Sequence, residues 1–259
     1  MKCIDRILLI VCLISPLYGY SCSKVKRDIL FQTSTINALL EGIYDGDVTF
    51  GELRKYGDFG LGTLNGLDGE LVVLDGKFYQ VRSDGIVNPV DSSMKTPFAV
   101  VTFHEADKTV MANKSLNLEQ LEGYLDSILP SQNIFYAIRI DGTFRYIKVR
   151  SVPRQERPYP RLVDVVKNQP TFEFYDMKGT IVAFWLPEYI NGINIPGYHF
   201  HFLTEDKQSG GHILSVITGD IRIQIDYTSE IHMVLPGSKE FSSVDLTKEK
   251  QKELESVEK

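Results

Sequence analysis

The sequence predicts an α+β fold of two mainly β halves, with mixed or barrel-like sheets and a few peripheral helices. Short runs rich in β-branched and aromatic residues recur along the chain, and turn dipeptides such as Asp75-Gly76 and Gly210-Gly211 separate them. Apolar residues keep a helical spacing over one longer segment, residues 115–129. A chain of 259 residues with 43% hydrophobic and 24% charged residues is long enough to bury a full core.

The first 22 residues have the pattern of a signal peptide. A short charged segment precedes an apolar run, residues 7–18, that fits a signal peptide and is too short to span a bilayer. The cleavage site is either that of a bacterial lipoprotein, with a lipid anchor at Cys22, or that of a plain signal peptide cut near Tyr20 or Ser21. All three cysteines lie in this leader, so the body of the chain has no thiolate ligand and no disulfide. We therefore expect an exported protein that is secreted, periplasmic or anchored at the cell surface.

The remaining chain is predicted to form two domains. Residues 28–165 would be an N-terminal α+β domain, and residues 166–259 a C-terminal metal-binding β domain with a charged tail. Between the predicted strands, residues 150–161 carry three prolines and exclude regular structure for most of their length. A similarity between residues 62–70 and 179–198 suggests a duplicated unit.

The N-terminal domain is expected to begin with short helices from Asp28 onward. Leu39, Leu40 and Ile43 would form the apolar edge of the first. The second would begin at the capping-box spacing of Thr49 and Glu52.

Strands and one further helix complete this domain. Residues 71–81 form a hairpin across Asp75-Gly76, residues 98–104 a strand and residues 115–129 a helix. Residues 134–139 and 143–149 are expected to form another hairpin, across Asp141-Gly142.

The C-terminal domain is predicted to be mostly β. A short helix near residues 162–166 precedes strands at 171–175 and 180–186, a hairpin beginning near residue 199, and a strand at 220–227. The tail from residue 245 is almost wholly charged, and its simplest interpretation is a solvated, frayed helix.

Three of the five histidines lie within fourteen residues. His199 and His201 are two apart, so on a strand both side chains leave the same face. Residues 204–211 are polar and end in Gly-Gly, which indicates a hairpin loop that would bring His212 beside them. Three imidazoles on a rigid sheet suit a divalent transition metal with an open coordination position. For any one of the three alone, an ordinary strand-face or loop-edge histidine would be the favoured interpretation. The isolated His104 and His232 are expected to be satisfied core or edge histidines.

Two other residues could take part in chemistry. Glu70 ends a glycine-rich turn, where a carboxylate is either a solvated edge residue or a placed acid or base. Arg150 closes a strand just before irregular backbone, where its forked donors could bind an anion. Both have an ordinary structural interpretation as well. The net charge of −6 gives no electrostatic reason to expect nucleic acid or an anionic membrane as partner.

Four blocks in this order resemble the signature blocks of the α-acetolactate decarboxylase family, and the resemblance runs from about Asp28 to the C-terminus. They are residues 57–70 (GDFGLGTLNGLDGE), 96–99 (TPFA), 150–159 (RSVPRQERPY) and 197–212 (GYHFHFLTEDKQSGGH). The resemblance implies conversion of 2-acetolactate to acetoin and CO2, the acetoin-forming step of the butanediol pathway, by a homodimer.

The same resemblance assigns roles to individual residues. His199, His201 and His212 would hold zinc, which acts as a Lewis acid on the ketone and hydroxyl of the substrate. Thr63, Glu70 and Arg150 match substrate-pocket positions, with Arg150 orienting the carboxylate. A glutamate from the tail would also enter the site, with Glu258 the best match and Glu255 the second. Glu70 or the tail glutamate would protonate the enediolate.

Two other functions remain open on the residues alone. His199, His201 and Glu205 also fit the first half of a cupin metal motif, which would make the protein a metal-dependent dioxygenase or isomerase. No second cupin motif with a further histidine follows downstream. The other alternative is a non-catalytic exported metal-binding protein.

Overall fold

The computed structural model describes residues 28–248 and 250–258. The strands are β1 (Ile29–Thr33), β2 (Val48–Thr49), β3 (Phe59–Thr63), β4 (Glu70–Leu74), β5 (Lys77–Val81), β6 (Val87–Pro89), β7 (Lys95–Thr96), β8 (Ala99–Thr102), β9 (Lys108–Asn113), β10 (Phe135–Arg150), β11 (Thr171–Leu186), β12 (Gly197–Thr204), β13 (Gly210–Thr228) and β14 (Glu230–Val234). The helices are α1 (Ile36–Leu40), α2 (Phe50–Leu53), α3 (Leu118–Ile128), α4 (Leu162–Val165), α5 (Lys239–Ser243) and α6 (Gln251–Glu258), with short 3-10 turns η1 (Val166–Asn168) and η2 (Glu188–Ile190).

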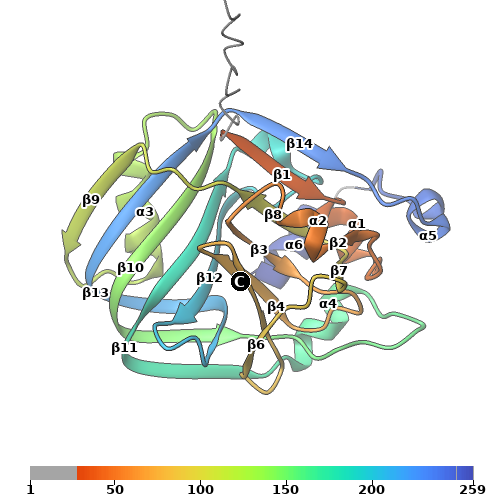
Figure 1. The fold of residues 1–259 in the computed structure, drawn as a ribbon, viewed down its shortest axis with the longest axis horizontal. Coiled ribbons are helices and arrows are strands. Elements are labelled where there is room, and N and C mark those ends of the chain that lie inside the picture. The colour runs from red at the N-terminus through yellow and green to blue at the C-terminus, as the bar shows by residue number, and fades with distance from the viewer. Residues whose placement is uncertain (1–27, 249, 259) are drawn as a thin grey trace, which may run out of the picture.

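The first sheet brings the first and last strands of the described chain together. Its seven strands run in the order β14-β1-β8-β3-β4-β5-β6. The β1 strand pairs in parallel with β14 and antiparallel with β8, so a C-terminal strand completes a sheet built from the N-terminal third (Figure 1). This pairing explains why β1 replaces the helix expected directly after Asp28; the first helix, α1, follows it.

The second sheet closes on itself. Its order is β10-β11-β12-β13-β9, and β13 also pairs with β10 along most of its length. Because β10, β11, β12 and β13 thus form a closed ring, this half is a small barrel, with β9 on one edge and α3 alongside (Figure 1). The predicted α+β class with mixed, barrel-like sheets is confirmed.

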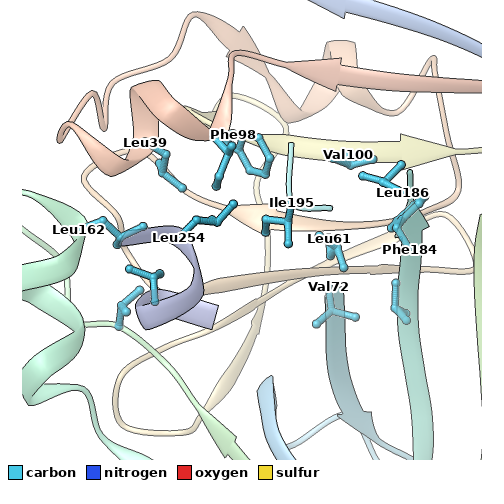
Figure 2. Close-up of a cluster of buried hydrophobic side chains, with 14 of the residues drawn as sticks. Leu39, Leu61, Val72, Phe98, Val100, Leu162, Phe184, Leu186, Ile195 and Leu254 are labelled. Atoms are coloured by element: carbon cyan, nitrogen blue, oxygen red, sulfur yellow. The ribbon is translucent and has the colours of Figure 1, made fainter. Parts of the chain in front are cut away.

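The main hydrophobic core lies between the two sheets. It combines side chains of the first sheet, such as Leu61 and Val72, with Phe184 of the barrel strand β11. Leu254 of α6 also belongs to it and lies near Leu162 of α4 (Figure 2). The tail is therefore part of the core, and the expectation of a solvated, frayed helix is wrong. The tail is ordered because its two apolar side chains, Leu254 and Val257, are buried.

The prediction of a hairpin across Asp141-Gly142 is also wrong, because β10 runs through both residues without turning. Gly142 lies opposite Gly179 on β11 and Ile221 on β13. A Cβ atom at Gly142 would lie 2.3 Å from the backbone oxygen of Asp220. The glycine therefore allows a neighbouring strand to approach closely and does not mark a turn.

Other strands that were predicted to be separate are parts of single long barrel strands. The strands expected at 171–175 and 180–186 are one strand, β11, and the strand expected at 220–227 is the second part of β13.

Several local predictions are confirmed. The β4–β5 hairpin turns at Asp75-Gly76, where both residues have positive φ. The capping box at Thr49 begins α2, and α3 falls within 115–129.

Some predictions stay open. The signal peptide at residues 1–22, with its lipid anchor at Cys22, lies outside the described residues. The domain boundary between residues 165 and 166 and the duplicated unit remain predictions. Across residues 28–248 and 250–258, no helix combines the length and the apolar character needed to cross a membrane.

Candidate metal centre

The β12–β13 hairpin brings the three predicted histidines together. His199 and His201 alternate with phenylalanines on β12, and His201 lies directly opposite His212 of β13. All three side chains are buried. In the described part of the chain they form the one cluster of potential metal ligands, with ligand atoms within 4.8 Å of one another. The hairpin predicted from the sequence is confirmed.

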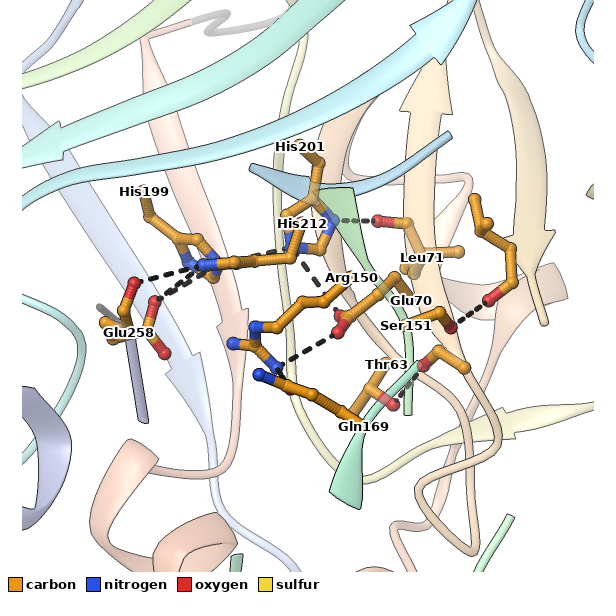
Figure 3. Close-up of polar contacts among 12 residues, drawn as sticks. Thr63, Glu70, Leu71, Arg150, Ser151, Gln169, His199, His201, His212 and Glu258 are labelled. Atoms are coloured by element: carbon orange, nitrogen blue, oxygen red, sulfur yellow. Dashed lines mark hydrogen bonds and ion pairs between the residues drawn. The ribbon is translucent and has the colours of Figure 1, made fainter. Parts of the chain in front are cut away.

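The imidazole nitrogens converge on one point (Figure 3). The Nε2 atom of His199 lies 3.1 Å from Nε2 of His201 and 3.1 Å from Nδ1 of His212. The opposite nitrogens bind backbone oxygens: Nδ1 of His201 donates to Leu71 at 2.8 Å, and Nε2 of His212 donates to Glu258 at 3.4 Å. These hydrogen bonds fix the tautomers of His201 and His212, so their lone pairs face the centre of the cluster.

Burial keeps the imidazoles neutral. It lowers the pKa of His201 to about 3, and the hydrogen bond to Leu71 only partly offsets this. Burial, together with the positive charge of Arg150, also lowers the pKa of His199 and of His212 well below the ordinary value. Neutral imidazoles carry the free lone pairs that a divalent transition metal requires.

The pairing of β10 with β13, which closes the barrel, places Arg150 beside the three histidines. Arg150 is the last residue of β10 and pairs with His212 of β13, which pairs in turn with His201 of β12. Gly211 permits this approach, because its φ is 143° and a Cβ atom there would lie 2.3 Å from the backbone oxygen of Arg150. The guanidinium is buried, and Nη1 donates to Gln169 Oε1 at 3.1 Å.

The first sheet contributes Glu70 and Thr63, which face each other across the β3–β4 hairpin. Glu70 Oε2 lies 3.6 Å from Nε2 of His201, and its Oε1 lies 3.5 Å from Nη1 of Arg150. The Thr63 hydroxyl donates to the backbone oxygen of Gly69 at 2.7 Å, which fixes the glycine-rich turn before Glu70. Both residues therefore reach the site through one local hairpin.

The tail supplies a second carboxylate, Glu258, on the other side of the imidazoles from Glu70 (Figure 3). Its Oε2 lies 3.7 Å from Nε2 of His199 and 3.7 Å from Nε2 of His212. This oxygen is buried and has no hydrogen-bond partner among the described residues. Glu255 is exposed and lines an outer groove. Of the two tail glutamates considered, the structure thus brings Glu258 to the cluster.

The carboxyl groups of Glu70 and Glu258 both have a raised pKa. Burial raises the pKa of Glu70 to about 7, although Arg150 opposes the shift. Burial raises the pKa of Glu258 to about 7 as well, with Arg150 opposing and the negative charge of Glu70 adding to the shift. Near neutral pH each group therefore exchanges a proton readily, as a general acid or base must.

A cavity of about 40 Å³ lies beside these polar groups. Its apolar wall comes from α1, α4, α6 and the loops between strands. The wall residues are Ile36, Leu39, Leu67, Phe98, Val152, Leu162, Ile195 and Val257. The sequence analysis identified neither this wall nor Gln169, the acceptor for Arg150. No spacing rule connects such distant residues, and only the fold brings them together.

The two remaining histidines serve as aromatic packing partners. The His104 ring lies 4.8 Å from that of Phe59, and the His232 ring 5.2 Å from that of Phe31. Neither belongs to the cluster of potential ligands. Both are therefore structural residues, as expected, but the buried Nε2 atom of His104 has no hydrogen-bond partner among the described residues, so His104 is not a fully satisfied histidine.

Taken together, the residues offer three neutral nitrogen ligands, two carboxyl groups that titrate near neutral pH and one buried guanidinium. The nitrogens could bind a divalent metal, and the guanidinium could bind an anionic group beside it. A carboxyl group on either side could donate or accept a proton. Such a site suits reactions in which negative charge develops on a small acidic substrate.

Comparisons with known proteins agree with this geometry. The family model described as "Alpha-acetolactate decarboxylase" matches residues 30–248. An alpha-acetolactate decarboxylase of Methanosarcina mazei is 50% identical over 237 residues, which cover 92% of this chain and 82% of that protein. The crystal structure of the alpha-acetolactate decarboxylase from Bacillus subtilis strain 168 aligns with a TM-score of 0.87 at 43% identity, covering 89% of this chain and 99% of that one. A Staphylococcus aureus protein described as similar to this enzyme aligns with a TM-score of 0.82 at 32% identity, covering 88% of this chain and 98% of that one.

Proposed function

Because the chain belongs to the alpha-acetolactate decarboxylase family, we propose that it converts 2-acetolactate to acetoin and CO2. The observation that carries the proposal is the cluster of three buried imidazoles between two carboxyl groups, with a buried guanidinium beside it. This donor set suits a β-keto acid that bears a carboxylate, a ketone and a hydroxyl group.

His199, His201 and His212 would hold a zinc ion. Nitrogen ligands of tetrahedral zinc, each about 2.0 Å from the metal, lie roughly 3.3 Å apart. The separations of 3.1 Å around Nε2 of His199 are close to this value. The unpartnered Glu258 Oε2 also suits a neighbouring cation. When bound, zinc would supply Lewis-acid stabilisation of the negative charge that develops on the substrate.

Arg150 would bind and orient the substrate carboxylate. Its guanidinium is buried, and its Nε atom has no hydrogen-bond partner among the described residues, so one donor remains for a ligand. Loss of CO2 breaks the bond between the carboxylate carbon and the hydroxyl-bearing carbon. The electron pair of that bond moves toward the adjacent ketone and gives an enediolate. An interaction that binds the carboxylate equally before and during this step raises affinity more than rate.

Glu70 or Glu258 would then deliver a proton to the carbon that lost CO2, which gives acetoin. The two carboxyl groups approach the imidazoles from different sides, so the one that acts sets the face of protonation and the acetoin stereocentre. The apolar wall of the cavity, with Leu39 and Val257 among its residues, would lower the local polarity and so strengthen the electrostatic contacts beside it.

The cellular setting of the enzyme is part of the same proposal. The leader at residues 1–22 supports export, either as a free protein or with a lipid anchor at Cys22. The family resemblance supports a homodimer. A cupin-type dioxygenase or a non-catalytic metal-binding protein would not form acetoin.

The test is to supply racemic 2-acetolactate to the purified protein and to measure acetoin. Zinc-loaded protein is expected to form acetoin and CO2 in equal amounts, and chelator-treated protein to lose most of the activity until zinc is restored. If zinc-loaded protein forms no acetoin above the spontaneous rate, the proposed function is wrong.

A further inference from the structure

The α6 helix has little stability of its own. It contains eight residues, and isolated helices shorter than about 12–15 residues are marginal in water. Leu254 and Val257 are its buried residues. Yet its last residue, Glu258, lies against the imidazole cluster. Contacts with the rest of the protein must therefore determine where α6 lies.

A cluster of four charged side chains fastens α6 to two other helices. Lys250, directly before α6, forms an ion pair with Glu41, which caps the C-terminus of α1. Arg161, at the N-terminus of α4, donates through Nη2 to Glu41 Oε1 at 2.8 Å and to Glu253 Oε2 of α6 at 2.5 Å. Lys250 Nζ lies 3.9 Å from the same Glu253 oxygen. Two positive and two negative groups thus balance one another.

The burial of Lys250 makes this cluster unlike an ordinary surface ion pair, although the side chains of Arg161 and Glu253 stay 40% and 35% exposed. Lys250 is only 6% exposed, and lysine is rarely buried without a partner. Burial raises the pKa of Glu41, but Lys250 and Arg161 outweigh it and hold that pKa below its ordinary value. Replacing Lys250 would remove the buried cation of the cluster and leave Arg161, a partly solvent-exposed side chain, as the remaining partner of Glu41 and Glu253. Because Glu41 of α1 and Glu253 of α6 share Lys250 and Arg161 as partners, the contacts between α6 and the two helices depend on one another.

The geometry connects the charged cluster to the imidazole cluster. Lys250, Leu254 and Val257 are spaced by four and three residues, so they share one face of the helical segment. That face packs toward Leu39 of α1 and Leu162 of α4, which also line the cavity. We propose that Glu41, Arg161, Lys250 and Glu253 form a latch that holds α6 where Glu258 meets the imidazoles. These four are positioning residues, and the proposal rests on the role proposed above for Glu258.

Hydrogen–deuterium exchange of the full-length protein tests the latch without reference to activity. In Lys250→Met, amides of residues 251–258 are expected to exchange at least tenfold faster than in the parent protein. The matched control is Lys252→Met, which removes an exposed lysine from the same helix and should leave their exchange unchanged. Equal exchange of residues 251–258 in the parent protein and Lys250→Met would overturn the proposal. If Lys250→Met does not fold, Glu41→Gln takes its place with the same expectations.

A second measurement asks whether the latch acts through Glu258. Lys250→Met is expected to lower kcat/KM at least tenfold in the parent protein and less than twofold in a Glu258→Gln background. Equal losses in both backgrounds would show that Lys250 acts elsewhere, and the proposal would fail. If the parent protein forms no acetoin, the proposed function fails, while the exchange measurement still decides whether the four residues hold α6.

Discussion

The carboxyl group of Glu70 lies between the Arg150 guanidinium and the His201 imidazole. In this position it can be either protonated or ionised near neutral pH. One carboxyl oxygen lies 3.5 Å from Arg150 and the other 3.6 Å from His201. Burial raises its pKa to about 7 against the opposing effect of Arg150. A solvated glutamate would be ionised almost completely at this pH. Its chemistry therefore follows from its surroundings more than from its residue type.

Replacing Glu70 by glutamine tests its role as an acid or base. Glu70→Gln keeps the shape of the side chain but cannot deliver a proton, so kcat should fall by about 10²–10⁴. Metal content should stay the same, because the three imidazoles remain. Acetoin formation and metal content are measured on the same sample, with the exposed Glu156→Gln as control. Acetoin formation within threefold of the parent would rule out this role.

Arg150 is expected to affect substrate affinity more than rate. Arg150→Lys keeps the charge but loses the fork that can bind a carboxylate through two donors. A charge-assisted hydrogen bond contributes about 1.5–3 kcal/mol, so KM should rise roughly 10–100-fold with a smaller change in kcat. Steady-state kinetics measure both constants, and the exposed Arg154→Lys serves as control. A large fall in kcat at unchanged KM would instead assign Arg150 to the transition state.

Asp226 provides a pH-dependent test away from the site. Burial, with added repulsion from Asp107, Asp28 and Glu105, raises its pKa to about 7, while the Glu105 backbone N–H opposes the shift. The folded protein therefore binds a proton that the unfolded chain has lost above about pH 4, and stability falls as pH rises toward 7. Asp226→Asn removes this cost. Its gain in unfolding free energy should be roughly 2–3 kcal/mol larger at pH 8 than at pH 5, as measured by denaturant unfolding.

An equal effect of Asp226→Asn at both pH values would mean that Asp226 titrates normally in the folded protein. Asparagine keeps an oxygen that can accept the backbone N–H of Glu105, now 3.2 Å from Oδ2. The comparison therefore isolates the charge of the carboxylate.

At the scale of elements, the barrel depends on the close approach of long strands. β10 pairs with β11 on one side and with β13 on the other. Gly142 and Gly211 both lie where a side chain would meet a neighbouring backbone oxygen at 2.3 Å. Closure at these points is what places Arg150 beside His212. The same close approach of β10 and β13 therefore closes the barrel and positions Arg150 in the site.

A pair of glycine substitutions tests this interpretation. Gly142→Ala should lower the unfolding free energy by about 2 kcal/mol or more, because its Cβ atom would meet Asp220. Gly123→Ala should raise it by about 0.5–1 kcal/mol, since Gly123 lies within α3 and nothing lies within 4 Å of its Cβ position. Denaturant unfolding measures both. A neutral Gly142→Ala variant would contradict the close approach of β10 and β13.

At the scale of the whole molecule, the site lies where the two sheets meet. The barrel provides the imidazoles and Arg150, the seven-stranded sheet provides Thr63 and Glu70, and α6 provides Glu258. The main core also draws on both sheets and on α6. A change that loosens the contact between the sheets should therefore disturb stability and the site together.

The sequence could predict only what local spacing determines. The alternation of His199 and His201, and the glycine-rich loop before His212, are local, so the triad followed from the sequence. Asp141-Gly142 has the same composition as the true turn Asp75-Gly76. Its pairing with the distant strands β11 and β13, which local sequence does not reveal, keeps it inside β10. The resemblance pointed to Glu258, but no spacing could predict the ion pairs of Lys250 or the Gln169 contact of Arg150. These are long-range consequences of the fold.

The most direct test of the central claim is the metal content per chain of the purified protein and its histidine variants. The parent protein should bind one equivalent of zinc, and His199→Ala, His201→Ala and His212→Ala should each lose most of it. His104→Ala and His232→Ala, which change the histidines outside the cluster, should retain it. Zinc content that is unchanged in the three triad variants, or that is lost only in the other two, would contradict the account.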